Sequence, residues 1–108
     1  MGRVIPIILY KDWRRNLRQI VKYYGGHPKN SWQGNLKEFV RLWEGKPQKN
    51  WRDNYKALVL AIDGKPQRDW REDIKEFLRE IGGTPTKNWR NNIREISRVI
   101  QIRGNYCG

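Results

Sequence analysis

Basic side chains recur in this chain at intervals of four residues, and their types and spacing suit the binding of anions. A spacing of four places side chains in a row along one face of a helix, with successive members about 6 Å apart. Guanidinium and ammonium groups in such a row bind phosphate or carboxylate oxygens. The members of this basic ridge are Arg14, Arg18, Lys22, Lys37, Arg41, Arg52, Lys56, Arg71, Lys75, Arg79, Arg90, Arg94 and Arg98.

The net charge exceeds what the carboxylates of the chain can neutralise. Lys and Arg number 23 against 11 Asp and Glu, a formal charge of +12. Some cations follow a glutamate by three residues, a spacing that predicts ion pairs worth a few tenths of a kcal/mol each. These pairs are Glu38 with Arg41, Glu76 with Arg79 and Glu95 with Arg98. The remaining surplus indicates a polyanionic partner, either an acidic protein surface or a nucleic-acid backbone.

Residues able to perform catalysis are few and scattered. His27 is the single histidine and Cys107 the single cysteine, so neither a metal-ligand cluster nor an internal disulfide is indicated. No base is placed to activate the thiol, and the glycine pairs follow no predicted strand that would make them a phosphate-binding loop. We therefore expect a protein that is not an enzyme, with no cofactor, no metal and no small-molecule substrate.

The elements that must position the ridge are repeats of 19 residues. Each repeat is numbered here from its tryptophan, so that the basic ridge occupies positions 2, 6 and 10. Aromatic residues interleaved with cations can stack on bases, but position 1 shares a helical side with the apolar positions, so we assign these tryptophans to the core. The five tryptophans are Trp13, Trp32, Trp51, Trp70 and Trp89.

Each repeat carries a start signal for one helix, and the first four repeats also carry a stop signal, which is lost in the fifth, where Ile102 replaces the glycine. Position 19 holds residues preferred as helix N-caps: Asp12, Ser31, Asn50, Asp69 and Asn88. Glycine at position 14 is predicted to adopt the left-handed C′ conformation, followed two residues later by proline. The glycines are Gly26, Gly45, Gly64 and Gly83. We predict a helix of about 12 to 13 residues per repeat and a loop of about 6.

Apolar residues at positions 1, 5, 8, 9 and 12 form one helical stripe, which stacked neighbours must bury. A polar residue at position 4, usually asparagine, is expected to tie each helix to a loop. The fold class predicted for residues 12–102 is all-α: five tandem single-helix repeats stacked as a small solenoid or a helical bundle. Pattern alone leaves an open superhelix and a compact bundle equally possible, and it leaves the oligomeric state open.

The two ends depart from the repeat. Residues 1–11 form an extended apolar arm, which either caps the first helix or docks on a partner. Residues 103–108 are expected to be a C-terminal tail. No segment has the length and composition of a transmembrane helix or a signal peptide, so we expect a virion or cytoplasmic location. The residues that would make the arm a docking element are Val4, Ile5, Ile7, Ile8, Leu9 and Tyr10.

A family resemblance rests on the segment from Ile81 to Ile96, with its sequence IGGTPTKNWRNNIREI. It is similar to short helical repeats of the form GG-x-P followed by N-W-x-x-x-[LI]-x-x-I in virion proteins of tailed bacteriophages. The similarity extends over residues 12–102. It implies a small structural component that docks on a capsid, neck, tail or fibre without catalysis, and it assigns no functional residues.

Three functions follow from these patterns. The first is a structural interaction module that grips an acidic protein in an assembly through the basic ridge and the arm. The second is a protein that binds a nucleic-acid backbone without sequence specificity, because the cations are present but no recognition-helix motif is. Adhesion to a membrane surface is disfavoured, since the apolar stripes are needed for the core.

Overall fold

The computed structural model describes residues 6–105, and Cys107, Val4 and Ile5 lie outside them. The described residues form five helices joined by loops, with no strand among them. The repeats of the all-α fold predicted from the sequence are therefore confirmed. The helices are α1 (Trp13–Tyr23), α2 (Trp32–Leu42), α3 (Trp51–Ala61), α4 (Trp70–Glu80) and α5 (Trp89–Asn105).

Helix starts agree with the predicted N-caps. Asp12 accepts a hydrogen bond from the Arg14 backbone amide, and Ser31 accepts one from that of Gly34. Asn50, Asp69 and Asn88 do the same for the amides two residues further on. Each cap satisfies one of the backbone N–H groups that the first turn of a helix leaves unpaired.

Helix ends differ from the prediction by one residue. The left-handed residue is at position 13 and not at position 14, because the backbone closes in a Schellman motif. The position-14 amide donates to the position-9 carbonyl at 2.8–2.9 Å, and the position-13 amide donates to position 10 at 2.9–3.1 Å. The left-handed residues are Gly25 (φ 77°), Glu44 (φ 63°), Asp63 (φ 59°) and Gly82 (φ 98°).

Glycine is required at position 14 because a larger side chain there would clash with the position-9 side chain. A Cβ atom at Gly45 would lie 2.9 Å from Val40 Cγ1, and one at Gly83 would lie 2.3 Å from Leu78 Cδ1. The loop therefore crosses directly over the position-9 side chain. As a result α1 to α4 have 11 residues each, slightly fewer than expected, because position 12 is already the C-cap.

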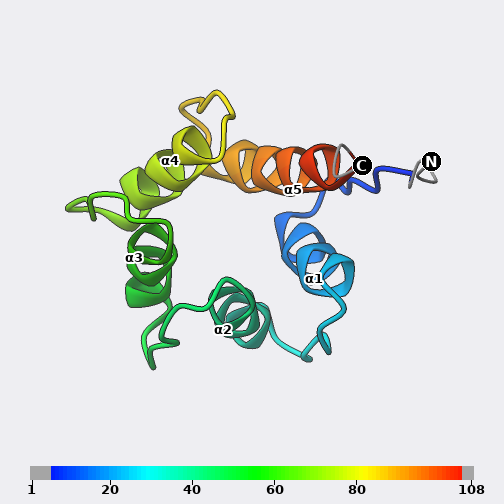
Figure 1. Ribbon diagram of the computed structural model, residues 1–108, viewed down its shortest axis with the longest axis horizontal. Coiled ribbons are helices and arrows are strands. Elements are labelled where there is room, and N and C mark those ends of the chain that lie inside the picture. Colours follow the sequence, from blue (N-terminus) through cyan, green and yellow to red (C-terminus); the bar gives the residue numbers. More distant parts are fainter. Residues whose placement is uncertain (1–5, 106–108) are drawn as a thin grey trace.

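The helices close into a ring (Figure 1). Each helix packs against its neighbours in the sequence, and α5 returns to pack against α1. The α-carbon radius of gyration is 13.0 Å, about that of a compact domain of this length. Of the two arrangements that the repeat pattern leaves open, the chain adopts the compact one, so neither terminal helix exposes an unpaired stripe.

Contacts among the five tryptophans run all the way around the closed ring. Their indoles form a cycle of edge-to-face contacts, with ring centroids 5.0–5.4 Å apart between successive repeats. Trp89 completes the cycle by packing on Trp13 at 5.0 Å. Because every tryptophan begins its helix, the five helix N-termini lie together at one end of the ring. Each indole is partly buried against the core, as the sequence pattern indicates.

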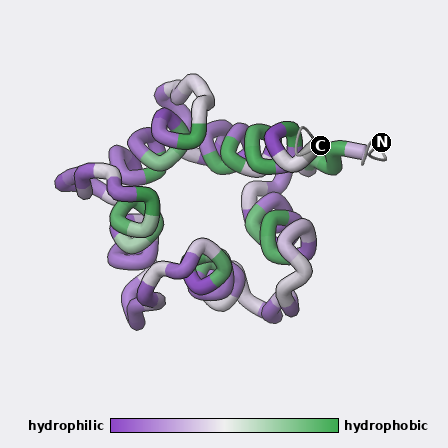
Figure 2. The backbone as a smooth tube through the Cα atoms, viewed as in Figure 1, coloured by the Kyte–Doolittle hydropathy of each residue, from purple (hydrophilic) through white to green (hydrophobic). Residues whose placement is uncertain are grey.

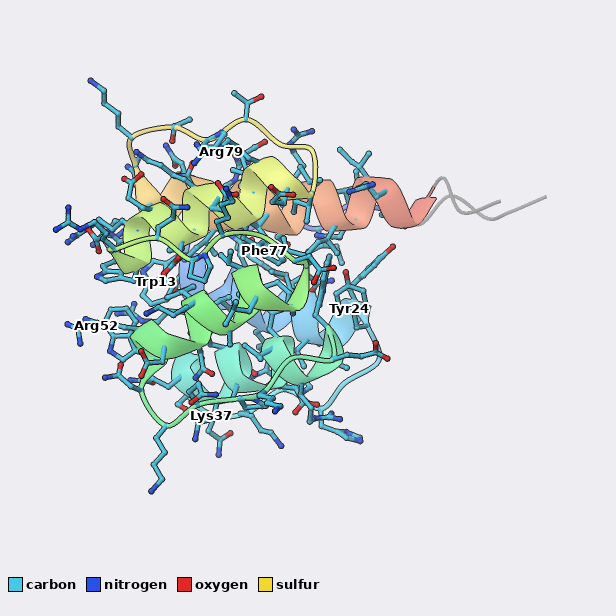
Figure 3. The ribbon with its side chains drawn as sticks, turned by 60° about the vertical axis from the view of Figure 1, so that its left-hand side comes forward. Trp13, Tyr24, Lys37, Arg52, Phe77 and Arg79 are labelled. Atoms are coloured by element: carbon cyan, nitrogen blue, oxygen red, sulfur yellow. The ribbon has the colours of Figure 1, made fainter. Side chains whose placement is uncertain are left out.

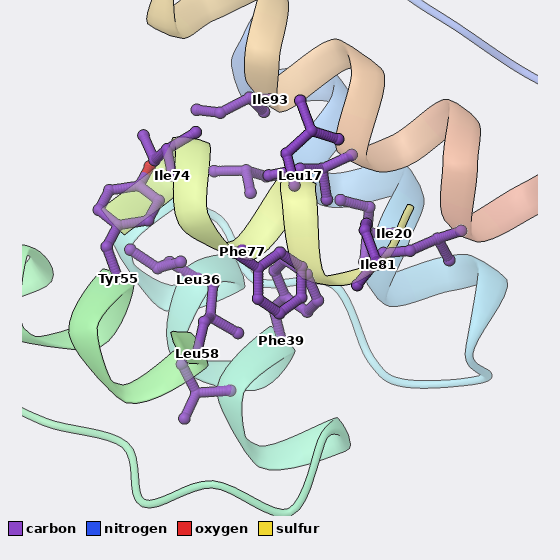
Figure 4. Close-up of a cluster of buried hydrophobic side chains, with 14 of the residues drawn as sticks. Leu17, Ile20, Leu36, Phe39, Tyr55, Leu58, Ile74, Phe77, Ile81 and Ile93 are labelled. Atoms are coloured by element: carbon purple, nitrogen blue, oxygen red, sulfur yellow. The ribbon is translucent and has the colours of Figure 1, made fainter. Parts of the chain in front are cut away.

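The interior of the ring is filled by side chains from positions 5, 8 and 9 (Figure 4). Phe39 and Phe77 meet edge to face at 5.6 Å, and Trp43 packs on both. Hydrophilic residues occupy the loops that project outward between the helices (Figure 2). The core is thus one continuous cluster shared by all five repeats.

The position-4 residues tie each helix to the loop that precedes it, as predicted. In four repeats the asparagine Oδ1 accepts from a position-17 backbone N–H, and its Nδ2 donates to the carbonyl of the same residue, as Asn54 does with Gln48 at 2.7 and 3.0 Å. These asparagines are almost completely buried. The others pair Asn16 with Tyr10, Asn35 with Lys29 and Asn92 with Thr86.

Both ends of the described chain join the ring. The backbone N–H of Ile8 donates to Gln101 Oε1 at 2.9 Å, and Gln101 Nε2 donates back to the Ile8 carbonyl at 2.9 Å. Helix α5 continues to Asn105, into the segment expected as a tail, because it lacks the Gly-x-Pro stop of the other repeats. The Arg103 guanidinium there donates to the Ile81 carbonyl at 2.6 Å.

Candidate anion-binding surface

Three of the four cations at position 10 are neutralised within their own helices, and Lys22 of α1 is the exception. Arg41 pairs with Glu38, Arg79 Nη2 lies 3.3 Å from Glu76 Oε1, and the corresponding Arg98–Glu95 distance is 2.8 Å. These are the predicted i, i+3 pairs. They also place positive charge in the last turns of α2 and α4, which the helix dipole favours. Accordingly, the Arg41 hydrogen bond lowers the pKa of the Glu38 carboxyl.

Position-2 arginines lie over the tryptophans. The guanidinium carbons of Arg14, Arg52, Arg71 and Arg90 lie 4.4–4.9 Å from the indole centroids of their own repeats. A cation–π contact leaves the guanidinium N–H donors able to bind oxygen acceptors, as Arg71 Nη1 does with Asp69 Oδ2 at 3.5 Å. Trp13 and Arg52 are seen at the same end of the molecule in Figure 3, with Tyr24 at the opposite end.

Repeat 2 is the exception at this position. Gln33 stands where the other repeats have arginine, so Trp32 has no guanidinium from its own repeat above it. Among the described residues no cation–π contact to Trp32 is formed within the distances seen for the other four indoles.

Position-6 cations make up most of the basic-ridge members that form no ion pair. Lys75 lies 3.3 Å from Glu72, but Arg18, Lys37, Lys56 and Arg94 are exposed. Within the described part of the chain these four form no ion pair of 4 Å or less. Lys37 projects from the outer surface of α2 (Figure 3). The pairs that do form are local to each helix, so neighbouring repeats do not neutralise one another.

The unpaired charge gathers on α1. At position 3, α1 has Arg15, whereas two other repeats have the acidic residues Asp53 and Glu72. At position 7, α1 has Gln19, whereas three other repeats have glutamate. The result is a row of cations on a helix that contains no acidic residue, with Asp12 Oδ1 3.9 Å from Arg14 Nη1 as its nearest carboxylate partner. We call this row the α1 strip. Its members are Arg14, Arg15, Arg18 and Lys22.

Two hollows flank the α1 strip. One, of about 410 Å³, is lined by Tyr10, Arg15, Arg18, Gln19 and Lys22. The other, of about 160 Å³, lies between α1 and α2 and is called the α1–α2 cleft. No carboxylate lines either hollow among the described residues. The cleft is lined by Arg14, Arg15, Arg18, Lys29, Asn30, Ser31, Trp32 and Asn35.

The corresponding cleft between α3 and α4 shows that this composition is not a property of every repeat. It is lined by residues from the same repeat positions, including Arg52, Lys56 and Arg68. Three carboxylates share it with these cations, those of Asp53, Asp69 and Asp73. The three cations and three carboxylates therefore balance there, and the α3–α4 cleft lacks the positive excess of the α1–α2 cleft.

The described part of the arm lies on the protein's own fold. Besides the Ile8–Gln101 pair, the Tyr10 backbone is held by Asn16 through two hydrogen bonds of 2.9 Å. Arg15 stacks on the Tyr10 ring at 4.3 Å. Leu9 is half-buried, but Ile7 and Ile8 remain 41% and 42% exposed.

Sequence reasoning identified the ridge but treated its members as equivalent. The predicted ridge left out Arg15 and the loop residue Lys29, which lie outside positions 2, 6 and 10 yet line the α1–α2 cleft. The signal was present in the departures from the repeat at positions 3 and 7, where α1 loses its acidic residues. The closure that places α1 beside α5 had no sequence signal of comparable clarity.

Searches for similar proteins leave the family unassigned: no family model, curated protein or solved structure matches the chain. In the described residues, no group of three or more His, Cys, Asp or Glu side chains could hold a metal ion. None of the described helices has the length and hydropathy needed to cross a bilayer.

Proposed function

We propose that this protein is a non-enzymatic binding module that holds a nucleic-acid backbone through the α1 strip, without reading base sequence. The observation that carries the proposal is the uneven charge: the position-10 arginines of α2, α4 and α5 are paired, whereas α1 presents four cations and no acidic residue. Phosphates spaced along a backbone match such a row, and each neutralised phosphate releases counterions.

The composition of the strip favours nucleic acid over an acidic protein. Protein interfaces place aromatic and apolar anchors at their centre and are depleted of charged side chains there. The α1 strip has the opposite character, since its exposed residues are nearly all cationic. Guanidinium groups also match phosphate oxygens in a two-pronged geometry.

The test is fluorescence anisotropy with labelled duplex and single-stranded DNA at about 50 and 200 mM salt, where a protein with several phosphate contacts should lose orders of magnitude in affinity. The variant Arg14→Gln/Arg18→Gln removes two charges from the α1 strip and should flatten the salt dependence by about two phosphate contacts. Its matched control, Arg79→Gln/Arg98→Gln, removes two paired charges and should bind like the unaltered protein. Equal losses in the two variants would show that only total charge matters.

A second function, docking on another protein in a virion or a similar assembly, is favoured by one observation. Ile7 and Ile8 are among the few large apolar side chains exposed on the described surface, and they lie side by side in the arm. Replacing both by serine should abolish co-sedimentation with such an assembly and leave DNA affinity unchanged. Retained co-sedimentation would eliminate the arm as the docking element.

A further inference from the structure

The α1–α2 cleft combines two features that occur together nowhere else in the described ring. It is lined by four cations and no carboxylate, and it contains Trp32, the tryptophan that no arginine of its own repeat covers. We infer that this cleft holds the terminal phosphate of a nucleic-acid strand, with the adjoining base stacked on Trp32. The inference rests on the proposed function and names its preferred ligand.

Contacts within the fold restrain three of the four cations of the cleft before any ligand arrives. Lys29 has its backbone N–H bonded to Asn35 Oδ1 at 2.7 Å. Its aliphatic stem crosses the first turn of α2 so closely that a Cβ at Gly34 would lie 2.8 Å from Lys29 Cβ. Arg14 and Arg15 are stacked on Trp13 and Tyr10. Side chains ordered in advance lose less conformational entropy on binding.

The charge of the cleft selects a phosphate monoester. A terminal phosphate carries about −1.5 to −2 at pH 7, whereas an internal phosphodiester carries −1. Glu38, whose carboxyl pKa is lowered chiefly by the Arg41 hydrogen bond and further by the charge of Lys29, is paired with Arg41 and does not line the cleft. A dianion therefore gains more than a monoanion in a site with four cations.

We place a nucleic-acid base over Trp32 because position 2 of repeat 2 holds Gln33, where the other repeats have arginine. In four repeats a guanidinium lies over the indole, but partly buried Trp32, which lines the α1–α2 cleft, has none over it. Stacking of a base on an exposed indole is favourable and tolerates every base. A strand end is the part of a nucleic acid that offers an unpaired phosphate monoester and a terminal base together.

The first experiment titrates inorganic phosphate into the full chain labelled with ¹⁵N, with chloride at equal ionic strength as the blank. Saturable shifts of the Arg18, Lys29 and Ser31 resonances are expected. They should disappear in Arg18→Gln/Lys29→Gln and persist in Lys56→Gln/Arg68→Gln, which removes the same charge from the α3–α4 cleft. Absence of such shifts overturns the inference, whatever the affinity for DNA.

The second experiment compares single strands with a 5′-phosphate and a 5′-hydroxyl, each labelled at the 3′ end. The phosphorylated strand should bind on the order of tenfold more tightly, the value of a charge-assisted hydrogen bond. The variant Gln33→Arg tests the stacking step, because an added cation alone should tighten the binding of any polyanion, whereas covering Trp32 should weaken the binding of both strands. Tighter binding of both strands would show that no base stacks on Trp32.

The outcomes separate the two proposals. Strong binding of both strands without a preference overturns the terminal-phosphate site and leaves the proposed function standing. Failure to bind either strand removes the proposed function and this inference together, and phosphate shifts in the cleft would then indicate a phosphorylated protein as the ligand.

Discussion

Among single residues, Asp73 departs from the pattern that the other four repeats obey at position 4. Its Oδ1 accepts from the Gln67 backbone N–H at 2.7 Å, as the asparagines do in their own repeats. A carboxylate has no N–H to return, so the Gln67 carbonyl receives no hydrogen bond from the described residues. We expect Asp73→Asn to complete this pair and to raise the free energy of unfolding at pH 7 by about 1 kcal/mol.

The effect of Asp73→Asn should depend on pH. Burial raises the pKa of the Asp73 carboxyl, against smaller lowering effects of the Gln67 hydrogen bond and of Lys56, while Asp69 and Glu76 raise it further. A raised pKa in the folded state means that the protonated carboxyl stabilises the fold, and that this contribution is lost as pH rises through that pKa. The advantage of asparagine should therefore shrink between pH 7 and about pH 4. Urea unfolding at both pH values measures it, and a constant difference would contradict this account.

Steric contact at position 14 gives a second prediction at this scale. A Cβ at Gly64 would lie 2.9 Å from Val59 Cγ1 and 3.2 Å from the Val59 carbonyl oxygen, so Gly64→Ala must displace the loop or the valine. We expect a loss of about 1–3 kcal/mol in urea unfolding, the usual cost of overpacking. Thr84→Ala, in an exposed loop, serves as the control. A neutral Gly64→Ala would mean that the loop moves freely.

Individual elements were predictable to different degrees. The N-caps could be read from the sequence because a side chain such as Asn50 bonds its own helix, two or three residues away. The C-caps were misplaced by one residue, because glycine at position 14 meets a steric demand made by position 9 and not a demand on its own φ. In two repeats the left-handed residue is not a glycine but Glu44 or Asp63. Residue preferences disfavour this conformation for non-glycine residues, so the sequence did not indicate position 13.

The contact between the arm and α5 carries a prediction for these elements. Gln101 is 2% exposed and bonds both backbone groups of Ile8, besides the Ser97 hydroxyl. Gln101→Ala should lower stability by about 1–3 kcal/mol, because buried partners are left unpaired. It should also abolish hydrogen-exchange protection of the Ile8 amide. Gln48→Ala, which removes a bond in an exposed loop, should change neither, and a protected Ile8 in the Gln101 variant would show that other contacts hold the arm.

The molecule as a whole closes on itself, a property that no single repeat encodes. Closure depends on the rotation between neighbouring repeats, and a few degrees per repeat separate a ring from an open solenoid. The cycle of indole contacts shows that the ring is closed, because Trp89 packs on Trp13 with the same edge-to-face geometry with which it packs on Trp70. The candidate site shares this limit in part: its cations and the loss of acidic residues from α1 were visible in the sequence, but which ridge cations are paired could be seen only in the structure.

A closed ring has no true first repeat, and this gives the last prediction. A circular permutant that begins at Pro47, with the natural ends joined by a flexible linker, keeps every interhelical contact and alters only which loop is open. Its free energy of unfolding should fall by about 1 kcal/mol or less, since loop-closure entropy varies slowly with length. Removing residues 86–108 instead opens the ring, exposes one face of α1 and one of α4, and should abolish the cooperative thermal transition seen in near-ultraviolet circular dichroism. If that truncated chain still melts cooperatively with only a proportionate loss of stability, as an open repeat array does, the ring is not the cooperative unit.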